Sequence, residues 1–206
     1  IKKKLATSFS VMIAILLVMS FFSMVKLEEI DGEYTFLFED RAHKVIEVSK
    51  IQNAVSSQEL NLLSYVLRKN DEDLERLEER REIINTTIQE IKPLFIVPQM
   101  FEEIELIEEQ QTLYTEYAEQ IINHIDNNEI ELAQAILFDK VVPINEAMQQ
   151  AVDNIINFQK EEMENSSDVA SKMTDASCIL IIIANFISII IAILLAVFII
   201  KNISTP

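Results

Sequence analysis

Residues 178–200 read CILIIIANFISIIIAILLAVFII and are followed by Lys201. These 23 residues include no charge, proline or glycine. As a helix rising about 1.5 Å per residue, they are long enough to cross a hydrocarbon core of about 30 Å. We therefore expect a membrane span over residues 178–200. Upstream, residues 128–177 are compatible with helix apart from Pro143, so the sequence predicts one helix that continues from outside the membrane into it.

A second apolar run, residues 5–25, lies near the other end of the chain. Its 21 residues carry no charge, three lysines precede it, and Lys26 follows it. A cleaved signal peptide begins with the same order of basic and apolar residues. The run is longer than the usual apolar region of such a peptide, no A-x-A site follows, and the helical pattern continues beyond it. These features favour an uncleaved span.

The charges predict the orientation of both spans. All 34 acidic residues lie between Glu28 and Asp175, whereas residues 2–4 and Lys201 place lysines on the far sides of the spans. Because excess lysine marks the cytoplasmic side, we expect a multi-pass protein of the inner or plasma membrane. Both termini, including residues 1–4, would be cytoplasmic, and residues 26–177 extracellular.

The expected outer segment is strongly acidic. Residues 27–177 hold 12 of the 17 basic residues and all 34 acidic ones, a net charge of −22. Such a surface repels polyanions and argues against nucleic acid or anionic lipid as its partner. Cys178 is the only cysteine, so it could form a disulfide only between subunits.

One glycine and four prolines in 206 residues leave little material for tight turns, which predicts an all-α fold. Apolar residues recur every three or four positions over residues 27–69, 72–92, 98–125 and 128–177. Four amphipathic helices joined by short turns bury these stripes best as an antiparallel up-down-up-down four-helix bundle. The two spans would flank it, and the two-helix stalk next to the membrane lacks partner surface, which predicts a homodimer.

The helix boundaries carry their own signals. Asn70 or Asp71 is expected to cap the second outer helix, and Pro98 to occupy the first position of the third. Asn128, three residues ahead of Glu131, resembles a capping box for the fourth. In that fourth helix, Pro143 removes one hydrogen bond, so we expect a kink there.

Four features together resemble the sensory region of bacterial methyl-accepting chemotaxis proteins of the four-helix-bundle type. They are the basic start with the first span, LRKNDEDLERLEERREIINTTIQEIKPL at 67–94, DNNEIELAQAILFDKVVPINEAMQQAVDNIINFQKEE at 126–162, and KNISTP at 201–206, which is similar to the start of a HAMP linker. The resemblance implies a homodimeric receptor that binds a small molecule outside and moves its second span in a piston-like or rotational way. It also implies that a HAMP module follows Pro206, together with a cytoplasmic part that contacts signalling proteins. The same input module also precedes sensor histidine kinases and cyclases, so these outputs stay open.

Polar residues interrupt the apolar stripes at one height of the predicted bundle. At 1.5 Å per residue, Gln58, Arg81 and Gln111 reach the same level, where the fourth helix brings its Pro143–Asn145 region. Arg81 could hold a carboxylate there. We therefore predict a ligand site of Gln58, Arg81, Gln111 and Asn145.

The alternative is structural. Arg81 would then pair with a nearby acid, namely Glu59, Glu78 or Glu108, and the glutamines would fix the register of the helices. Arg81→Ala with unchanged ligand response would end the ligand-site hypothesis.

Other polar residues have simpler explanations. Arg41, lower in the expected stalk, is expected to make a dimer contact with an acid such as Glu162. Glu39, His43 and Glu47 share one face at i, i+4 spacing, which could suit a divalent metal. Because charged residues at this spacing more often form a solvated face, we expect no metal.

The remaining polar residues lie near the tip and in the second span. Arg68, Arg76 and Arg80 could attract an anion, but intrahelical pairs with Glu72 and nearby acids explain them. Within the second span, Asn185 and Ser188 are expected to face other helices rather than lipid.

No catalytic constellation appears in the sequence. It has no glycine-rich phosphate loop and no cysteine pair, and its two histidines, His43 and His124, fall on different predicted helices. We therefore expect neither an enzyme nor a bound cofactor. The competing function is a structural or partner-binding membrane protein, which an exposed apolar patch on the distal bundle would favour. A closed polar cavity within the bundle would favour the receptor.

Overall fold

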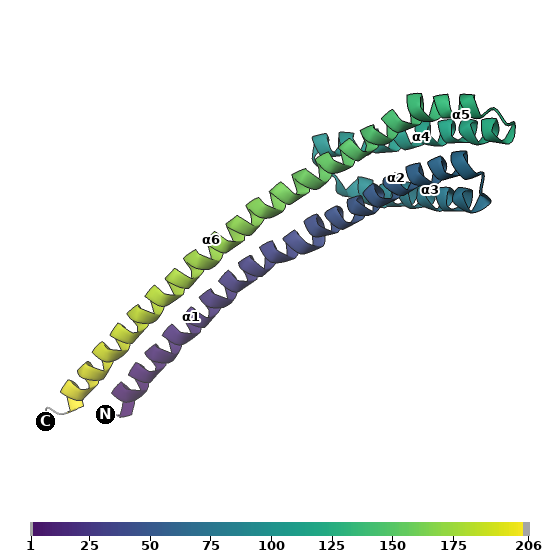
Figure 1. Cartoon of the computed structure of the whole chain (residues 1–206). Helices are drawn as coiled ribbons and strands as arrows, with labels where there is room; N and C mark the ends of the chain where they lie inside the picture. Colours follow the sequence, from purple (N-terminus) through teal and green to yellow (C-terminus); the bar gives the residue numbers. More distant parts are fainter. Residues whose placement is uncertain (1, 204–206) are drawn as a thin grey trace. The chain divides into compact units, whose positions relative to one another are not determined.

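The computed structural model describes residues 2–203, and within this range the chain is helical with short turns (Figure 1). The predicted all-α fold is confirmed. Residue 1 of the expected cytoplasmic terminus and residues 204–206 of the expected HAMP entry lie outside the described residues. The elements in chain order are α1 (Lys2–Phe36), the π-helix η1 (Leu37–Ala42), α2 (His43–Arg68), α3 (Asp71–Ile91), the 3-10 helix η2 (Lys92–Leu94), α4 (Pro98–Asp126), α5 (Ile130–Ile136), the π-helix η3 (Leu137–Val141) and α6 (Val142–Ile203).

The chain divides into two compact units. One unit holds residues 38–163, in which α2, α3, α4 and the segment from α5 to the start of α6 form the antiparallel up-down-up-down bundle (Figure 1). The other holds residues 1–37 and 164–206 and contains all of α1 and the second part of α6. The predicted four-helix bundle is therefore confirmed, and α6 is shared by both units.

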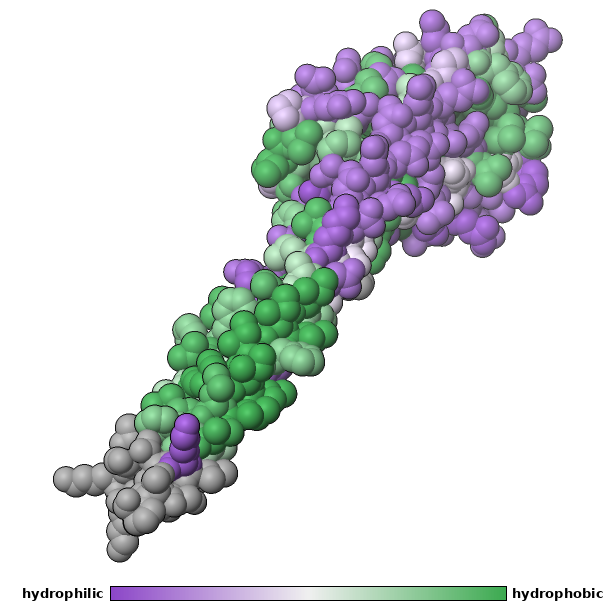
Figure 2. All heavy atoms as spheres, turned by 90° about the vertical axis from the view of Figure 1, so that its left-hand side faces the viewer, coloured by the Kyte–Doolittle hydropathy of each residue, from purple (hydrophilic) through white to green (hydrophobic). Residues whose placement is uncertain are grey.

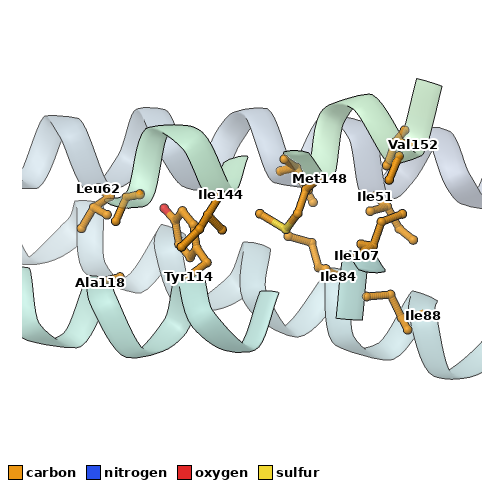
Figure 3. Packing of buried hydrophobic residues seen from close by; sticks show 14 of the residues in the cluster. Ile51, Leu62, Ile84, Ile88, Ile107, Tyr114, Ala118, Ile144, Met148 and Val152 are labelled. Atoms are coloured by element: carbon orange, nitrogen blue, oxygen red, sulfur yellow. The ribbon is translucent and has the colours of Figure 1, made fainter. Parts of the chain in front are cut away.

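The bundle core consists of apolar side chains from all four helices. Ile51, Ile84, Ile107 and Met148 come from α2, α3, α4 and α6, are all 0% exposed, and lie close together in Figure 3. Burying a side chain of this size contributes about 1.5–3 kcal/mol relative to leaving it in water. The stripe on α3 shows the spacing that brings such residues to one face: Leu77, Ile84, Ile88 and Ile91 are buried.

The turn between α2 and α3 forms at the predicted place. Lys69 adopts a left-handed conformation with a φ of 51°, and its N–H donates to the Tyr65 carbonyl at 2.8 Å. Asn70 is extended, and its side chain accepts a hydrogen bond from the Glu72 N–H at 3.3 Å. Of the two expected caps, Asn70 is therefore the one used.

Prolines shape the connection between α3 and α4. Pro93 lies in the short helix η2, and Phe95 after it is buried. Val97 is extended, as expected of a residue that precedes a proline. Pro98 is the first residue of α4, which confirms the predicted start of this helix.

The capping box predicted at Asn128 is wrong. Asn128 has a φ of 63°, and its N–H donates to the Ile125 carbonyl at 3.1 Å, so it belongs to the turn that ends α4. Helix α5 begins at Ile130, with Glu129 before it and no side-chain cap. Asparagine tolerates the left-handed conformation better than most residues, and here it is used for that property instead of for capping.

The irregularity expected at Pro143 takes the form of a π-helix. Residues Leu137–Val141 form η3, and α6 begins at Val142. Pro143 has no N–H, and in an α-helix its ring would collide with the carbonyl of residue 139. The wider turn just before it accommodates the ring. A second π-helix, η1, precedes α2 and has no counterpart in the sequence-based expectations.

In the two-helix unit, small side chains of α6 recur on one face. Ala170 and Ser177 are buried, and Thr174, Ala184 and Ser188 are half-buried. Positions 170, 177 and 184 follow a heptad, as do 174, 181 and 188, which is the pattern of a two-helix seam. This face of α6 therefore packs against α1.

The same unit carries the apolar stretches. Two helical stretches, within Ser10–Arg68 and Ile130–Phe198, are long and apolar enough to cross a membrane by length and composition. Their apolar windows are not buried inside the protein. Figure 2 shows this surface as a continuous hydrophobic zone along the paired helices.

Candidate functional site

Gln58 of α2 and Gln111 of α4 form a reciprocal amide pair inside the bundle. Gln58 Nε2 donates to Gln111 Oε1 at 3.0 Å, and Gln111 Nε2 donates to Gln58 Oε1 at 3.1 Å. The two residues are 0% and 1% exposed. Each amide gives the other a donor and an acceptor, which offsets the cost of burying them. The pair also fixes the height of α2 relative to α4.

Asn145 of α6 connects to α2 in the same part of the bundle. It is 1% exposed, and its Nδ2 donates to Glu59 Oε2 at 2.5 Å. Its Oδ1 is buried and has no partner among the described residues. The Asn145 carboxamide is therefore held through its Nδ2 alone, and its Oδ1 can still accept a hydrogen bond inside the bundle.

Arg81 of α3 is a buried cation, with 6% of its surface exposed. Its Nη1 donates to Glu78 Oε2 at 3.1 Å, and its Nη2 donates to the Thr115 carbonyl of α4 at 3.4 Å. Of the three acids considered as its partner, Glu78 makes the ion pair. The Glu78 side chain is 73% exposed, so water screens this pair. The Arg81 Nε is buried without a partner in the described part of the chain.

Tyr114 of α4 belongs to this site although it was not among the site residues predicted from the sequence. Its ring is fully buried, and its Oη has no partner among residues 2–203. Burial raises the pKa of the phenol, Arg81 lowers it, and Glu59 raises it further. Both charges thus act on one buried hydroxyl. The sequence shows a tyrosine at a core position, but only the fold shows that its hydroxyl lacks a partner.

The predicted site residues form three local groups within one region of the bundle. They are the glutamine pair, Asn145 with Glu59, and Arg81 with Glu78. Arg81 Nε offers a donor, Asn145 Oδ1 an acceptor, and Tyr114 Oη can act as both. Such groups can hold a small polar molecule by hydrogen bonds. Ligand binding by Gln58, Arg81, Gln111 and Asn145 stays a prediction.

The architecture agrees with a comparison of the sequence with protein families. Residues 1–174 match a family described as the four helix bundle sensory module for signal transduction. The chain belongs to this family. The match covers the first apolar stretch and the whole bundle, which confirms the resemblance drawn from the sequence. A search of curated proteins gave no match.

At one end of the bundle of this sensory module, a salt bridge joins α6 to η1. Arg41 Nη2 lies 2.9 Å from Glu162 Oε2 in the same chain. Glu162 was the expected partner, but the expectation was a contact across a dimer. The side chains of Arg41 and Glu162 are 16% and 37% exposed, so water partly screens the bridge. It ties η1 to α6.

The possible metal trio at Glu39, His43 and Glu47 is not assembled. His43 Nδ1 lies 4.0 Å from Glu47 Oε1, and Lys50 Nζ donates to both oxygens of Glu47 at 2.6 and 2.8 Å. Among the described residues, no group of three or more histidine, cysteine, aspartate or glutamate side chains is placed to hold a metal ion.

The cations near the tip of the sensory module have local partners. Arg76 Nη2 donates to Glu72 Oε1 at 2.6 Å, the intrahelical pair expected from the sequence.

A tyrosine hydrogen bond also lies near the tip. Tyr65 Oη donates to Asp126 Oδ1 at 3.0 Å, which links the end of α2 to the end of α4. Burial, together with this hydrogen bond, raises the pKa of Tyr65 to about 12.

An open groove between α2 and α3 was not foreseen. Its walls carry charges of both signs, and its volume is about 560 Å³. The residues that line it include Lys50, Asn53, Arg80, Glu82 and Thr86. These side chains lie outside the buried stripes, where the sequence pattern predicts only a solvated face.

Proposed function

We propose that this chain is the input module of a transmembrane receptor, which senses a small molecule outside the cell and passes the signal inward. One observation carries the proposal. Helix α6 runs without interruption from Val142 to Ile203, so one helix holds Asn145 and Met148 in the bundle core and also contains the apolar stretch 178–200. A shift of a helix by 1–2 Å at one end is transmitted along a rod of this kind.

The proposed topology places both termini in the cytoplasm and residues 26–177 outside, in a multi-pass protein of the inner or plasma membrane. The two long apolar helices support insertion. The lysines at residues 2–4 and Lys201, with all acidic residues between the spans, support the orientation.

We propose that the ligand binds within the bundle at Gln58, Arg81, Gln111 and Asn145. The open hydrogen-bonding atoms of Arg81, Asn145 and Tyr114 support this location. Recognition would be by hydrogen bonds and charge, without catalysis and without a cofactor. The ligand is therefore a small polar molecule, and its release restores the resting bundle.

The proposed receptor is a homodimer. On α2, Ile46, Leu60 and Leu67 lie at multiples of seven residues and are 57%, 65% and 69% exposed. Apolar residues at heptad spacing on a free helix face are typical of a helix pair. A second copy of α2 would cover them.

The signal would leave through residues 201–206 into a HAMP module and a cytoplasmic signalling domain. Chemotaxis signalling is the output we propose, because the fold is that of a sensory module for signal transduction. A histidine kinase or a cyclase after Pro206 would use the same input.

A thermal-shift screen of amino acids, organic acids and other small metabolites on the full chain in nanodiscs tests the proposal. We expect at least one compound to raise the melting temperature of the wild type. Arg81→Gln should lose this shift, whereas Arg76→Gln, which removes an exposed intrahelical pair, should keep it. A folded dimer with no response to any compound would contradict the proposal, and an equal response of Arg81→Gln would contradict the location.

A second candidate function has one observation in its favour. Ile130 and Leu132 of α5 and Phe138 of η3 are 51%, 53% and 61% exposed. Exposed apolar residues in one segment are typical of a surface that contacts another protein. If the bundle docks a partner protein, Phe138→Ser should abolish capture of that partner from cell extracts and leave any small-molecule shift unchanged.

A further inference from the structure

The groove between α2 and α3 lies apart from the buried polar layer of the bundle. Its volume of about 560 Å³ is within the range of about 300–1,000 Å³ that is usual for small-molecule sites. One wall is formed by Lys50, Asn53 and Ala54 of α2, and the other by α3 residues between Glu79 and Thr87. None of the four residues proposed to bind a ligand in the bundle core lines this groove. It is therefore a separate candidate site.

The floor of the groove is mostly apolar. Ala54 and Thr87 are buried, and Ile83 is partly buried and packs against the bundle core. The charged lining residues are more exposed than these three and so form the rim. An apolar floor below a charged rim suits a molecule with a short hydrocarbon skeleton and charged ends.

Arg80 offers the rim an incompletely used cation. Its Nη2 lies 3.4 Å from Glu79 Oε2, which is its only contact among the described residues. The Arg80 side chain is 35% exposed, and a guanidinium carries five N–H donors in a planar fork that fits a carboxylate. Lys50, in contrast, already donates to both oxygens of Glu47. Arg80 is therefore the better carboxylate-binding group of the two.

Glu82 offers an unpaired carboxylate on the same helix. It makes no ion pair or hydrogen bond within residues 2–203. Residues 80 and 82 are two positions apart, so their side chains do not face each other and flank the helix face that carries Ile83. The groove thus has a free acid at one edge of α3 and an arginine at the other.

Uncharged hydrogen-bonding groups lie between these edges. Thr86 and Thr87 make no side-chain hydrogen bond within the part of the chain that the structure describes. Thr112 and Thr115 of α4, in contrast, donate to the carbonyls four residues before them. The hydroxyls of Thr86 and Thr87 are therefore available to a bound molecule.

We propose that this groove binds a small zwitterion, a molecule that carries a carboxylate and an ammonium group on a short hydrocarbon skeleton. Arg80 holds the carboxylate, Glu82 holds the ammonium group, and the skeleton lies over Ala54 and Ile83. A dianion would meet the like charges of Glu79 and Glu82, and a polyamine would meet those of Lys50 and Arg80, which disfavours both classes. The inference adds a second site to the proposed function and does not depend on binding in the bundle core.

Isothermal titration calorimetry of the full chain in nanodiscs tests the class of molecule. The probes are glycine, β-alanine and γ-aminobutyrate, in which the two charges are progressively farther apart, and empty nanodiscs are the blank. We expect at least one probe to bind. The carboxylic acid and the amine that each lack one charge of that probe should bind at least about 10-fold more weakly, since each loses one charge-assisted contact. Binding by none of the three zwitterions, or equal binding of the singly charged analogues, would overturn the proposal.

Substitutions on α3 test the location. Arg80→Gln and Glu82→Gln should each weaken binding of the zwitterion about 10-fold. The matched controls Arg76→Gln and Glu75→Gln remove the same charges from exposed positions of α3 that do not line the groove, so they should bind it as the wild type does. Equal binding by Arg80→Gln and Glu82→Gln, with melting temperatures like that of the wild type, would overturn the proposal.

Arg81→Gln separates this inference from the proposed function. If Arg81→Gln loses the zwitterion while Arg80→Gln and Glu82→Gln keep it, the molecule binds in the bundle core. That result overturns the groove and supports the core site. Zwitterion binding that is lost in Arg80→Gln and Glu82→Gln supports the groove even if no compound binds the core.

Discussion

Replacing Gln58 alone should destabilise the bundle more than replacing Gln58 and Gln111 together. Gln58→Leu removes two hydrogen bonds, each worth about 0.5–1.5 kcal/mol net, and leaves a buried amide unpaired at a cost of about 1–3 kcal/mol. Because these two costs overlap, we expect a loss of about 2–4 kcal/mol in the free energy of unfolding.

The double variant removes both amides and leaves no orphaned group. Two leucines of similar size should bring the free energy of unfolding back to within about 1 kcal/mol of the wild type. The double-mutant cycle should therefore give a coupling energy of at least about 2 kcal/mol between Gln58 and Gln111.

Urea unfolding of the full chain in detergent micelles measures these values. The chain has no tryptophan, and three of its four tyrosines, Tyr65, Tyr114 and Tyr117, lie in the bundle unit, so tyrosine fluorescence reports its unfolding. If the loss of unfolding free energy in the double variant equals the sum of the losses in the two single variants, Gln58 and Gln111 are not energetically coupled and the reasoning is refuted.

Stability should be steady below pH 10 and fall as the pH rises towards 12. Burial and the Asp126 hydrogen bond raise the pKa of Tyr65 from 10.0 to about 12, so the protonated phenol stabilises the fold and this contribution is lost as the phenol ionises. In Tyr65→Phe, urea midpoints should lack the part of the decline between pH 10 and pH 12 that comes from this phenol. Asn70→Ala should lower the free energy of unfolding by about 1 kcal/mol, because Asn70 caps α3 at the Glu72 N–H. Asn70→Asp should keep the urea midpoint of the wild type. An unchanged midpoint in Asn70→Ala would show that the cap does not stabilise the bundle. Pro143→Ala should slow hydrogen exchange of the η3 amides, because an N–H at residue 143 can restore the regular helix bond; unchanged exchange would disconnect η3 from the proline.

The helices and their buried faces could be predicted because they depend on a local pattern. Residues such as Ile84, Ile88 and Ile91 repeat at helical spacing and are buried as expected. The turn at Asn70 was equally readable, since capping uses a side chain two residues from its target.

The two π-helices could not be predicted in form. Pro143 marks where regular bonding fails, but it does not say whether the helix bends or widens before it. The other π-helix, Leu37–Ala42, contains no proline, and its apolar spacing is that of an ordinary helix. The capping box predicted at Asn128 was wrong for a related reason, because asparagine suits both a helix cap and a left-handed turn.

The polar layer was predictable as a region but not as a set of contacts. Equal rise per residue brings Gln58 and Gln111 to one height, and they meet there. The sequence left the ion-pair partner of Arg81 open among three acids. The arginine side chain is long and flexible, so its rotamer decides which acid it reaches. The bond from Asn145 to Glu59 depends on how two distant helices are rotated, which no local pattern records.

The central claim is that α6 moves when a small molecule binds the bundle. Spin labels at Glu28→Cys on α1 and Val169→Cys on α6, in a Cys178→Ser background in nanodiscs, measure this movement by pulsed electron paramagnetic resonance. With the compound found by thermal shift, we predict a change in the distance between the labels that saturates at the same concentrations as the shift. An unchanged distance at concentrations that saturate the bundle would contradict the account.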